Sequence, residues 1–543
     1  MERSVGRYLL DQLYENGVKE IFGLPGDYVI RFNKLIEEHQ IRFINCTRED
    51  CAGYAADAYA RVRGLGAACI TYGVGISIVN AAAQAYVENS PVVIISGAPS
   101  NKEYAGSPFL HHLINKSHSV WRDLTQLEIF KQVTVDQIVL DDPAQAKALI
   151  DRALARSREF AKPVYIELPR DMVDVPLTEC PDEAFQFARP ELAGLNEAVY
   201  ALQELLGKAQ RPLAWLGREV QALGCKAPML AFLESNQLPF ATTLLGKAII
   251  SEHHPLFIGL YQGALSCPSI RQFVEDSDAI LVAGVILSDT NTGFHSDCLA
   301  KVPHAVITAD LIRINGREYS PSLFKALMNS LPDIKISAKR VPVALSAIQP
   351  FTPEPSKAIT TQRMFQAIQG YMADCIVVAD VGDCLFGSSE LILDENAYIA
   401  SGYFAALGSG MPMAIGAQLA EPARRTIAIV GDGGFQMSAL ELSTAVRYNL
   451  PIIVILLNNH GYGTERPLLE GDYNDLLDWR YTVFPQLFEQ GRARRAASET
   501  ELYESLQEAF AYKKGFYLLE VELGKMDFSA PLQRFCAVMK QRV

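Results

Sequence analysis

The sequence lacks the features that usually mark membrane, zinc-binding and nucleic-acid-binding proteins. No apolar run approaches the length that spans a bilayer, and the first residues are typical of an amphipathic helix rather than a signal peptide. The 10 cysteines form no CxxC pair and no Cys/His cluster, which argues against structural zinc and is typical of reduced thiols in a cytoplasm. Lysine and arginine form no basic stripe, and the net charge is −13. We therefore expect a cytoplasmic protein with no membrane and no nucleic-acid partner.

The length of the chain, 543 residues, is too great for a single hydrophobic core. Two stretches carry no sustained hydrophobic period and are typical of linkers, namely 176–190 and the proline-rich 349–355. Around them, short apolar runs alternate with helical patterns, as in the βα units of doubly wound sheets. We therefore predict an α/β fold of three doubly wound parallel-sheet domains, at 1–175, 190–345 and 356–543.

Two polar residues follow successive apolar runs in the third predicted domain. The run 426–431 ends at Asp432, a helix is expected from Gln436 to Tyr448, and the run 451–457 leads to Asn459. Continuous apolar runs are typical of parallel strands covered on both faces, and a crossover of this length brings both carboxyl ends to one edge. Open α/β sheets bind their ligands at that edge.

This edge offers ligands for a metal and a diphosphate. The Asp432 carboxylate, the Asn459 amide and a nearby backbone carbonyl suit Mg²⁺, which takes phosphate oxygens for its other positions. Gly433 and Gly434 permit a close backbone approach, and the N-terminus of the expected helix favours an anion. An Asp-Gly-Gly turn and an Asn-Asn helix cap would explain either half alone, but the two together favour a diphosphate–Mg²⁺ site.

The combination resembles the signature of thiamine diphosphate (ThDP) enzymes, in which Gly-Asp-Gly is followed at a set spacing by Asn-Asn. The resemblance extends over nearly the full chain and implies a pyrimidine domain, a middle domain and a diphosphate domain. It implies that Mg²⁺ binds Asp432, Asn459 and the carbonyl of Gly461. The implied cofactor contacts are Glu49, Ala405, Leu407, Gly431, Asp432, Gly433, Gly434, Asn459, Gly461 and Tyr462.

Four N-terminal motifs narrow the resemblance to the decarboxylase branch of the family. They are Gly23-Leu-Pro-Gly-Asp-Tyr28, Glu49 with Tyr54-Ala-Ala-Asp57, Thr71-Tyr-Gly-Val-Gly75 and Leu110-His-His112. The adjacent histidines mark pyruvate, indolepyruvate and branched-chain 2-keto acid decarboxylases. They separate this branch from acetolactate synthase and benzoylformate decarboxylase.

The resemblance also implies a role for each catalytic candidate. Glu49 would hold a proton at the pyrimidine ring, and we expect burial beneath its alanine-rich helix to favour this. The Ala405 carbonyl would accept a hydrogen bond from the cofactor's amino group, and Leu407 would be the apolar wedge beneath it. The acids and bases for the later steps would be Asp27, His111, His112 and Glu465.

Each candidate also has a plainer explanation. Asp27 could be an Asx-turn residue, and Glu49 could be a first-turn acid favoured by the helix dipole. The two histidines cannot share one helical face and could lie in a solvated loop, and Leu407 could be a core residue. These explanations have to hold independently, whereas one ThDP site accounts for all four.

The substrate pocket is expected to be roomy. Thr290 and Thr464 align with positions that are bulky in pyruvate-restricted relatives, and Leu385 and Leu468 should line the same apolar space. We therefore predict a substrate larger than pyruvate, branched or aromatic. The segment Val381-Gly-Asp-Cys384 departs from the family's Thr-Gly-Thr-Ser pattern, and Asp383 is left out of the binding set because a carboxylate beside a diphosphate would be unfavourable.

The predicted reaction is the non-oxidative decarboxylation of a 2-keto acid to an aldehyde and CO₂. The resemblance implies at least a homodimer, commonly a tetramer, in which two subunits build each site. A ThDP carboligase and a catalytically silent ThDP-binding subunit are the nearest alternatives, although intact Glu49 and histidine positions argue against the second. A nicotinamide-binding oxidoreductase is a further alternative, but Gly73-Val-Gly75 lacks the third glycine of that fingerprint.

Overall fold

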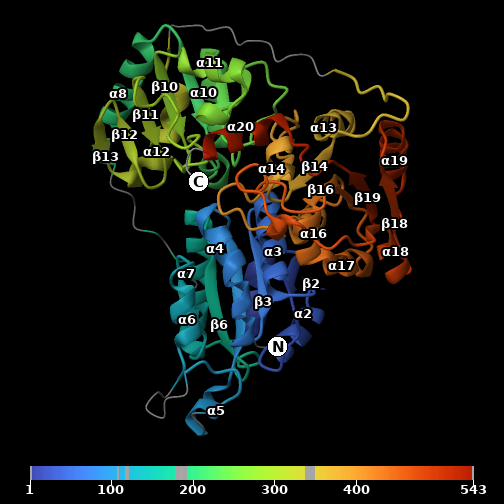
Figure 1. The fold of residues 1–543 in the computed structure, drawn as a ribbon. Coiled ribbons are helices and arrows are strands. Elements are labelled where there is room, and N and C mark those ends of the chain that lie inside the picture. Colours follow the sequence, from blue (N-terminus) through green and yellow to red (C-terminus); the bar gives the residue numbers. More distant parts are fainter. Residues whose placement is uncertain are drawn as a thin grey trace. The chain divides into compact units, whose positions relative to one another are not determined.

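The chain contains three β-sheets, each packed with helices. Figure 1 colours these parts in the order of the sequence. The computed structural model describes residues 3–106, 109–115, 122–178, 185, 187, 192–336 and 349–540. Two compact units are present. The first comprises Met1–Phe187, Met411–Ala423 and Ser438–Leu450, and the second comprises Ala188–Gly410, Arg424–Met437 and Pro451–Val543. None of the helices in the described ranges is long and apolar enough to cross a membrane.

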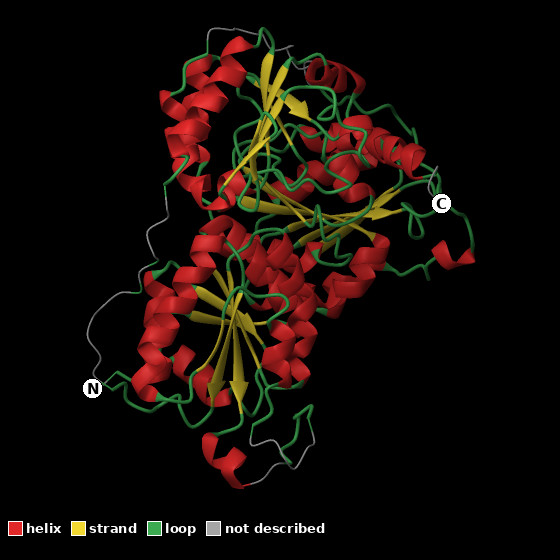
Figure 2. Cartoon of the chain, turned by 90° about the vertical axis from the view of Figure 1, so that its left-hand side faces the viewer, coloured by secondary structure: helices red, strands yellow, loops and turns green. Residues whose placement is uncertain are grey.

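The first unit is built on a six-stranded parallel sheet of order β2-β1-β3-β4-β6-β5. Helices cover both faces of this sheet (Figure 2), so the inner strands β1, β3, β4 and β6 are buried throughout, whereas the edge strands β2 and β5 are only partly buried. The strand order reverses between β1 and β3, which is the switch point where such sheets bind ligands. The strands are β1 (Glu20–Gly23), β2 (Arg42–Asn45), β3 (Gly66–Ile70), β4 (Val92–Ala98), β5 (Gln137–Val139) and β6 (Val164–Pro169).

The helices of the first unit include three from late in the sequence. The alanine-rich α3 packs very closely, because a Cβ atom at Gly416 would lie 2.0 Å from the Ala55 carbonyl oxygen and one at Gly66 would lie 2.1 Å from that of Ala56. The small side chains of α3 permit this close packing. The helices are α1 (Val5–Glu15), α2 (Ile30–Glu37), α3 (Glu49–Arg63), η1 (Val74–Ile78), α4 (Val79–Val87), α5 (Asn101–Gly106), α6 (Thr125–Phe130), α7 (Pro143–Phe160), most of α15 (Gly410–Ala420), η5 (Ala439–Glu441) and α17 (Leu442–Arg447).

The second unit contains two sheets, of which the first has seven strands in the order β13-β12-β11-β10-β7-β8-β9. Its edge differs from the purely parallel sheet that we predicted, because β12 and β13 are antiparallel. Asn315 and Gly316 join them with φ values of 48° and 82°, as a two-residue hairpin turn requires. The strands are β7 (Pro212–Leu216), β8 (Phe240–Thr242), β9 (Phe257–Leu260), β10 (Ala279–Ala283), β11 (His304–Ile307), β12 (Ile312–Ile314) and β13 (Arg317–Tyr319); helices include α8 (Leu195–Lys208), α9 (Glu219–Ala222), α10 (Lys226–Asn236), η2 (Gly263–Leu265), α11 (Pro268–Glu275) and α12 (Phe324–Ser330).

The last sheet has six parallel strands in the order β15-β14-β16-β17-β19-β18, the same topology as the first sheet. The helix expected from Gln436 to Tyr448 is different, because α16 begins at Asp432 itself and η5 interrupts the helical run. The strands are β14 (Cys375–Ala379), β15 (Tyr398–Ala400), β16 (Arg425–Gly431), β17 (Ile453–Asn458), β18 (Arg492–Ala496) and β19 (Tyr517–Glu522); the helices include α13 (Thr361–Gln369), α14 (Asp383–Ser388), α16 (Asp432–Ser438), α18 (Phe484–Leu487), α19 (Glu499–Ala511) and α20 (Ala530–Met539).

The α/β fold with three largely parallel sheets is thereby confirmed. The bounds predicted for the three domains stay predictions.

Candidate functional site

The first unit brings three of the four acid–base candidates together just beyond the switch point of its sheet, whereas the fourth, Glu465, belongs to the second unit. Asp27 follows β1, and one side-chain ligand atom each of Asp27, His111 and His112 lie within 4.8 Å of one another. The Nε2 atom of His111 is 2.8 Å from an oxygen of Asp27. The histidine and aspartate side chains thus form one cluster, which favours a shared chemical role over three unrelated surface positions.

Tyr28 holds the ring of His111 in place. Its ring stacks on that of His111 with centroids 4.8 Å apart, and its hydroxyl lies 3.2 Å from His111 Nδ1 and donates to the His111 carbonyl. Burial raises the pKa of Tyr28, so the hydroxyl keeps its proton. Arg170 approaches Asp27 to 3.8 Å and pairs with Glu103. The Nε2 atom of His111 therefore faces a carboxylate that can exchange a proton with it, whereas Nδ1 lies beside a hydroxyl that fixes the ring and keeps its proton.

The Thr71–Gly75 motif contacts the histidine pair directly. A Cβ atom at Gly73 would lie 2.1 Å from the carbonyl oxygen of His112, so only glycine fits at this position. The Gly73 N–H donates to the buried Gln126 side chain at 2.7 Å. Gln126 was not among the sequence candidates, because a single buried glutamine in a helix carries no recognisable motif.

Glu49 is the first residue of α3, and its position corrects one expectation. Burial beneath the alanine-rich helix was expected, but within this chain Glu49 is only half-buried. The helix buries its residues from Cys51 to Ala60, whereas Glu49 is its first residue and precedes this buried stretch. Its carboxylate accepts a hydrogen bond of 3.0 Å from the Ser77 hydroxyl. The group is thus oriented and open to a ligand.

The second unit joins the two loops that the sequence placed at one sheet edge. Strands β16 and β17 are parallel neighbours, and Asp432 and Asn459 follow their carboxyl ends. One oxygen of Asp432 accepts the N–H of Gly433 at 2.8 Å and the other accepts the N–H of Gly461 at 2.9 Å. Burial raises the pKa of Asp432 to about 6. The predicted meeting of the two loops is confirmed, and their roles in binding a metal stay predictions.

The two asparagines of the motif face different neighbours. The Nδ2 atom of Asn458 donates to Glu520 of β19 at 2.8 Å, which anchors the end of β17. A Cβ atom at Gly463 would lie 2.3 Å from the amide nitrogen of Asn459, so the loop folds tightly around Asn459. The Asn458 amide nitrogen is therefore directed to β19, whereas the Asn459 amide is enclosed by its own loop.

The wedge candidate, Leu407, is next to the glycine loop, which comprises residues 431–434. Leu407 is half-buried, and its Cδ1 atom would lie 3.3 Å from a Cβ atom at Gly434. Ala405 adopts a φ of 56°, a strained value for alanine that turns this loop. Leu407 is thus not a fully buried core residue, and its position fits the wedge better than the core alternative.

Asp380 is a buried carboxyl at this edge that the sequence reasoning missed. It follows β14, and one of its oxygens accepts the N–H groups of Val381 and Gly408 at 2.7 and 3.0 Å. The other oxygen has no hydrogen-bond partner in the described structure, and it lies 2.7 Å from where a Cβ atom at Gly434 would be. Asp380 therefore fixes the wedge loop and borders the glycine loop at the β14/β16 switch point.

The substrate-pocket candidates are only partly brought together. The Thr464 hydroxyl lies 3.2 Å from a Cβ position at Gly382, next to α14, which carries the buried Leu385. The N–H of Leu468 donates to the carbonyl of Glu465 at 2.9 Å, one turn earlier in the chain. The Thr290 hydroxyl, by contrast, is 3.1 Å from the Ser288 hydroxyl within its own loop.

Asp383 points away from the glycine loop towards α20. Its carboxylate accepts the N–H of Ser529 at 2.8 Å and also the Ser529 hydroxyl. Burial raises the pKa of Asp383 to about 6. The pairing explains how a carboxyl is accommodated in this segment, and it is consistent with leaving Asp383 out of the diphosphate contacts.

Replacing Asp380 by asparagine should change how stability depends on pH. Burial raises the pKa of Asp380 from 3.8 to about 6, so the native state holds this proton more tightly than the unfolded chain. Its stabilising contribution is full below pH 3.8 and is lost as the pH rises through 6. The wild type should therefore lose this contribution as the pH rises, whereas an asparagine has no proton to lose. The free energy of unfolding of Asp380→Asn, relative to the wild type, should rise by about 2 kcal/mol between pH 4 and pH 8.

Urea unfolding of the cofactor-free protein at several pH values measures this difference. Asp374→Asn is the matched control, because the Asp374 side chain at the other end of β14 is 86% exposed and solvent screens its charge. A difference for Asp380→Asn that stays constant from pH 4 to pH 8 would contradict the expectation.

Comparison with known proteins identifies the family. The chain matches the N-terminal TPP binding domain, the central domain and the C-terminal TPP binding domain of thiamine pyrophosphate enzymes over residues 3–124, 199–320 and 380–521. It is 34% identical to indole-3-pyruvate decarboxylase from Azospirillum brasilense, covering 98% of each chain. It is 32% identical to pyruvate decarboxylase 2 from Arabidopsis thaliana, covering 98% of this chain and 90% of the relative. The chain therefore belongs to the thiamine diphosphate-dependent 2-keto acid decarboxylases, which are carboxy-lyases.

Proposed function

We propose that this decarboxylase uses ThDP with Mg²⁺ to convert 2-keto acids larger than pyruvate to aldehydes and CO₂. The observation that carries the proposal is the junction at Asp432, whose carboxylate binds the N–H groups of both loops at the edge of the last sheet. The cluster of Asp27, His111 and His112 supplies the proton donors and acceptors that release of an aldehyde requires.

The residues at the sheet edge fit both cofactor and metal. Side chains at Gly433 and Gly434 would come within 2.6 Å of the Tyr462 ring and 2.7 Å of Asp380, so this loop can present only its backbone to a diphosphate. The Asp432 carboxylate, the Asn459 amide and the Gly461 carbonyl are hard oxygen ligands that suit Mg²⁺. A cation there would also offset the buried negative charge of Asp432.

The acid–base residues have separable tasks. When bound, ThDP supplies the carbon nucleophile and the electron sink for decarboxylation. Glu49 would hold a proton at its carboxylate, which Ser77 orients. The histidine cluster and Glu465 would deliver a proton to the developing aldehyde carbon and remove one from its oxygen.

The preference for large substrates rests on side-chain size. Thr464 faces Gly382, where a larger residue such as isoleucine or phenylalanine would fill the space beside α14. Thr290 is likewise smaller than the bulky residue that we expect at this position in pyruvate-restricted relatives, and Leu385 and Leu468 should line the same apolar space. A hydrophobic pocket discriminates by about 1–3 kcal/mol per missing methylene, so an enlarged pocket favours larger side chains only moderately.

Assembly of at least a homodimer, and commonly a tetramer, is also proposed. The side chains of His111 and Asp27 are 59% and 44% exposed within one chain, whereas acid–base groups work best where water is excluded. A second copy that covers this surface would provide the exclusion. Analytical ultracentrifugation measures the assembly directly. The cytoplasmic location stays a prediction.

Aldehyde formation from a panel of 2-keto acids tests the function. A coupled alcohol dehydrogenase assay should show turnover only when ThDP and Mg²⁺ are both present, and EDTA should abolish it. We expect kcat/KM for phenylpyruvate and 4-methyl-2-oxopentanoate to exceed that for pyruvate by about tenfold. Thr464→Ile should reduce this ratio, whereas Thr464→Ser should preserve it.

Two results would contradict the proposal. Equal or better turnover of pyruvate would overturn the preference for large substrates while leaving decarboxylation intact. Accumulation of acyloin in place of aldehyde would favour the carboligase alternative.

A further inference from the structure

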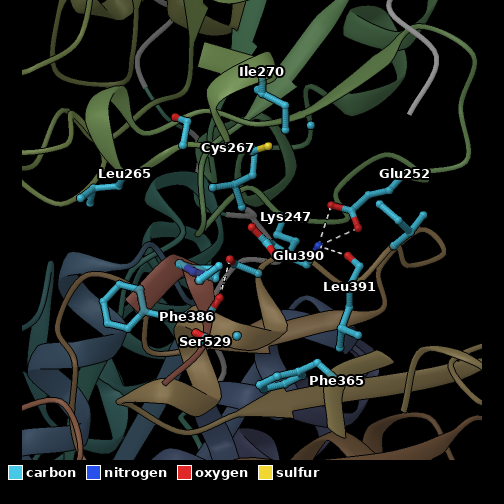
Figure 3. A pocket seen from close by; sticks show the side chains of 18 of the residues that line it. Lys247, Glu252, Leu265, Cys267, Ile270, Phe365, Phe386, Glu390, Leu391 and Ser529 are labelled. Carbon is cyan, nitrogen blue, oxygen red and sulfur yellow. Dashed lines mark hydrogen bonds and ion pairs between the residues drawn. The ribbon is translucent and has the colours of Figure 1, made fainter. Parts of the chain in front are cut away.

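A cavity separate from the predicted ThDP residues lies in the second unit. Its volume is about 680 Å³, in the range typical of small-molecule sites. Strand β9 and the following segment line one side, and α13, the end of α14 and the start of α20 line the other (Figure 3). The lining contains none of the residues assigned above to cofactor, metal, catalysis or substrate.

The charged groups of the cavity neutralise one another. Lys247 and Glu252 form a buried pair at 2.7 Å, and Lys247 also donates to the carbonyl of Leu391 (Figure 3). Arg534 pairs with Glu390 at 2.7 Å. A charged ligand would have to compete with these pairs and lose its own hydration, which is costly in a partly enclosed site. The cavity therefore favours an uncharged ligand.

The remaining surface is apolar and aromatic, with neutral hydrogen-bonding groups. Phe365 and Phe386 flank the cavity on the side of α13 and α14, and Ile270 lines the opposite side. Strand β9 is at the edge of its sheet, so it pairs with β8 along one side only and its other side offers backbone donors and acceptors. Gln362 and Ser269 add an amide and a hydroxyl. This chemistry matches a ring with one or two neutral polar groups.

The cavity is mechanically connected to the proposed substrate pocket through α14. Phe386 lines the cavity, whereas the preceding Leu385 packs in a different cluster and is a substrate-pocket candidate. The ring of Phe386 is 4.6 Å from that of Phe535 on α20, and Asp383 at the start of α14 binds Ser529 at the start of α20. A ligand that contacts Phe386 and Ser529 therefore touches both helices of this junction.

We propose that this cavity binds an uncharged aromatic small molecule and that its occupancy alters substrate use through α14. The binding site stands on the cavity alone. The coupling rests on the proposed function, because it assigns Leu385 to the substrate pocket.

Cys267 is a natural reporter of occupancy. It lines the cavity 3.5 Å from Ser269, and it is the only one of the nine cysteines in the described residues that is not buried. Methyl methanethiosulfonate converts its thiolate to a mixed disulfide with release of methanesulfinate. Peptide mass spectrometry separates this reaction from that of Cys180, which lies outside the described residues.

The test compares the rate of Cys267 labelling with and without indole as the uncharged aromatic probe and benzoate as its anionic counterpart. With a dissociation constant of about 1 mM, indole at about 2 mM should slow labelling about threefold, and benzoate should not. Gln362→Trp should abolish protection by filling the cavity from the opposite wall, and Gln362→Ala is its control. Gln362 is exposed, so neither variant disturbs the core.

Absence of protection by indole at up to about 10 mM, or equal protection by benzoate, would overturn the site. Protection that persists in Gln362→Trp would place the probe elsewhere and would also overturn it. For the coupling, indole should change kcat/KM for the 2-keto acid about fivefold in the wild type and not in Gln362→Trp. Protection without such a change would overturn the coupling alone. The labelling requires no turnover, so failure of the proposed decarboxylation is distinguished from failure of this site.

Discussion

Replacing Glu49 by glutamine should lower kcat by about 10³-fold while leaving ThDP binding nearly unchanged. Glutamine keeps the shape of the side chain and can still bond with Ser77, but it cannot take up a proton. The carboxylate accepts the Ser77 hydroxyl at 3.0 Å and is only half-buried, so the substitution should not disturb the core. Steady-state aldehyde formation and cofactor titration by circular dichroism measure the two quantities.

Asp50→Asn separates catalysis from helix stability. Both Glu49 and Asp50 lie in the first turn of α3, where an acid is favoured by the helix dipole. If Glu49 were only a first-turn acid, both variants would lose up to about 1 kcal/mol of stability and neither would lose much activity. We expect Asp50→Asn to keep kcat within about twofold of the wild type, because Asp50 pairs with Arg48 instead of facing a ligand. Similar kcat values for the two variants would refute a catalytic role for Glu49.

The sequence predicted the position of a site residue best where two apolar runs each end at a polar residue and the two residues form a recognisable pair. Asp432 and Asn459 were placed at a common sheet edge because their strands are continuous apolar runs, and β16 and β17 are indeed neighbours. The same pattern was present at Asp380, which follows the apolar β14, but no second motif drew attention to it. A buried carboxyl of this kind can be found from sequence only when every strand end is considered.

Other features depend on contacts that a linear pattern does not contain. The Asn315-Gly316 turn was a recognisable hairpin signal, and overlooking it led to the prediction of a purely parallel middle sheet. The stacking of Tyr28 on His111 could not be predicted, because it joins residues far apart in the chain through a loop of irregular structure. The cavity beside Cys267 likewise depends on how elements from two sheets pack.

Breaking the buried pair of Lys247 and Glu252 should produce the largest loss of stability. Both side chains are only 1% exposed, and the Lys247 ammonium lies 2.9 and 2.7 Å from the two carboxylate oxygens. Burial lowers the pKa of Lys247 and raises that of Glu252, so each charge depends on its partner. Lys247→Met leaves a buried carboxylate without a counter-charge, and we expect it to cost about 3–5 kcal/mol at pH 8.

The pH dependence of this loss identifies its cause. In Lys247→Met the isolated Glu252 carboxyl has a raised pKa, so it takes up a proton as the pH falls and the penalty for a buried charge disappears. The loss should therefore be smaller at pH 5 than at pH 8. The double variant Lys247→Met/Glu252→Gln should recover part of the stability at pH 8, because it buries no charge at all.

Urea unfolding followed by tryptophan emission measures this loss, and the fully buried Trp215, one of three tryptophans in the chain, contributes a signal from the sheet next to this pair. Arg313→Met is a matched control, since Arg313 pairs with Glu318 at the surface, where an ion pair contributes at most about 1 kcal/mol. If Lys247→Met lowered the free energy of unfolding by only about 1 kcal/mol at every pH, the pair would behave like a surface ion pair that water reaches. Because Glu252 also accepts the N–H of Leu393, the pair ties this wall of the cavity to the segment that follows α14.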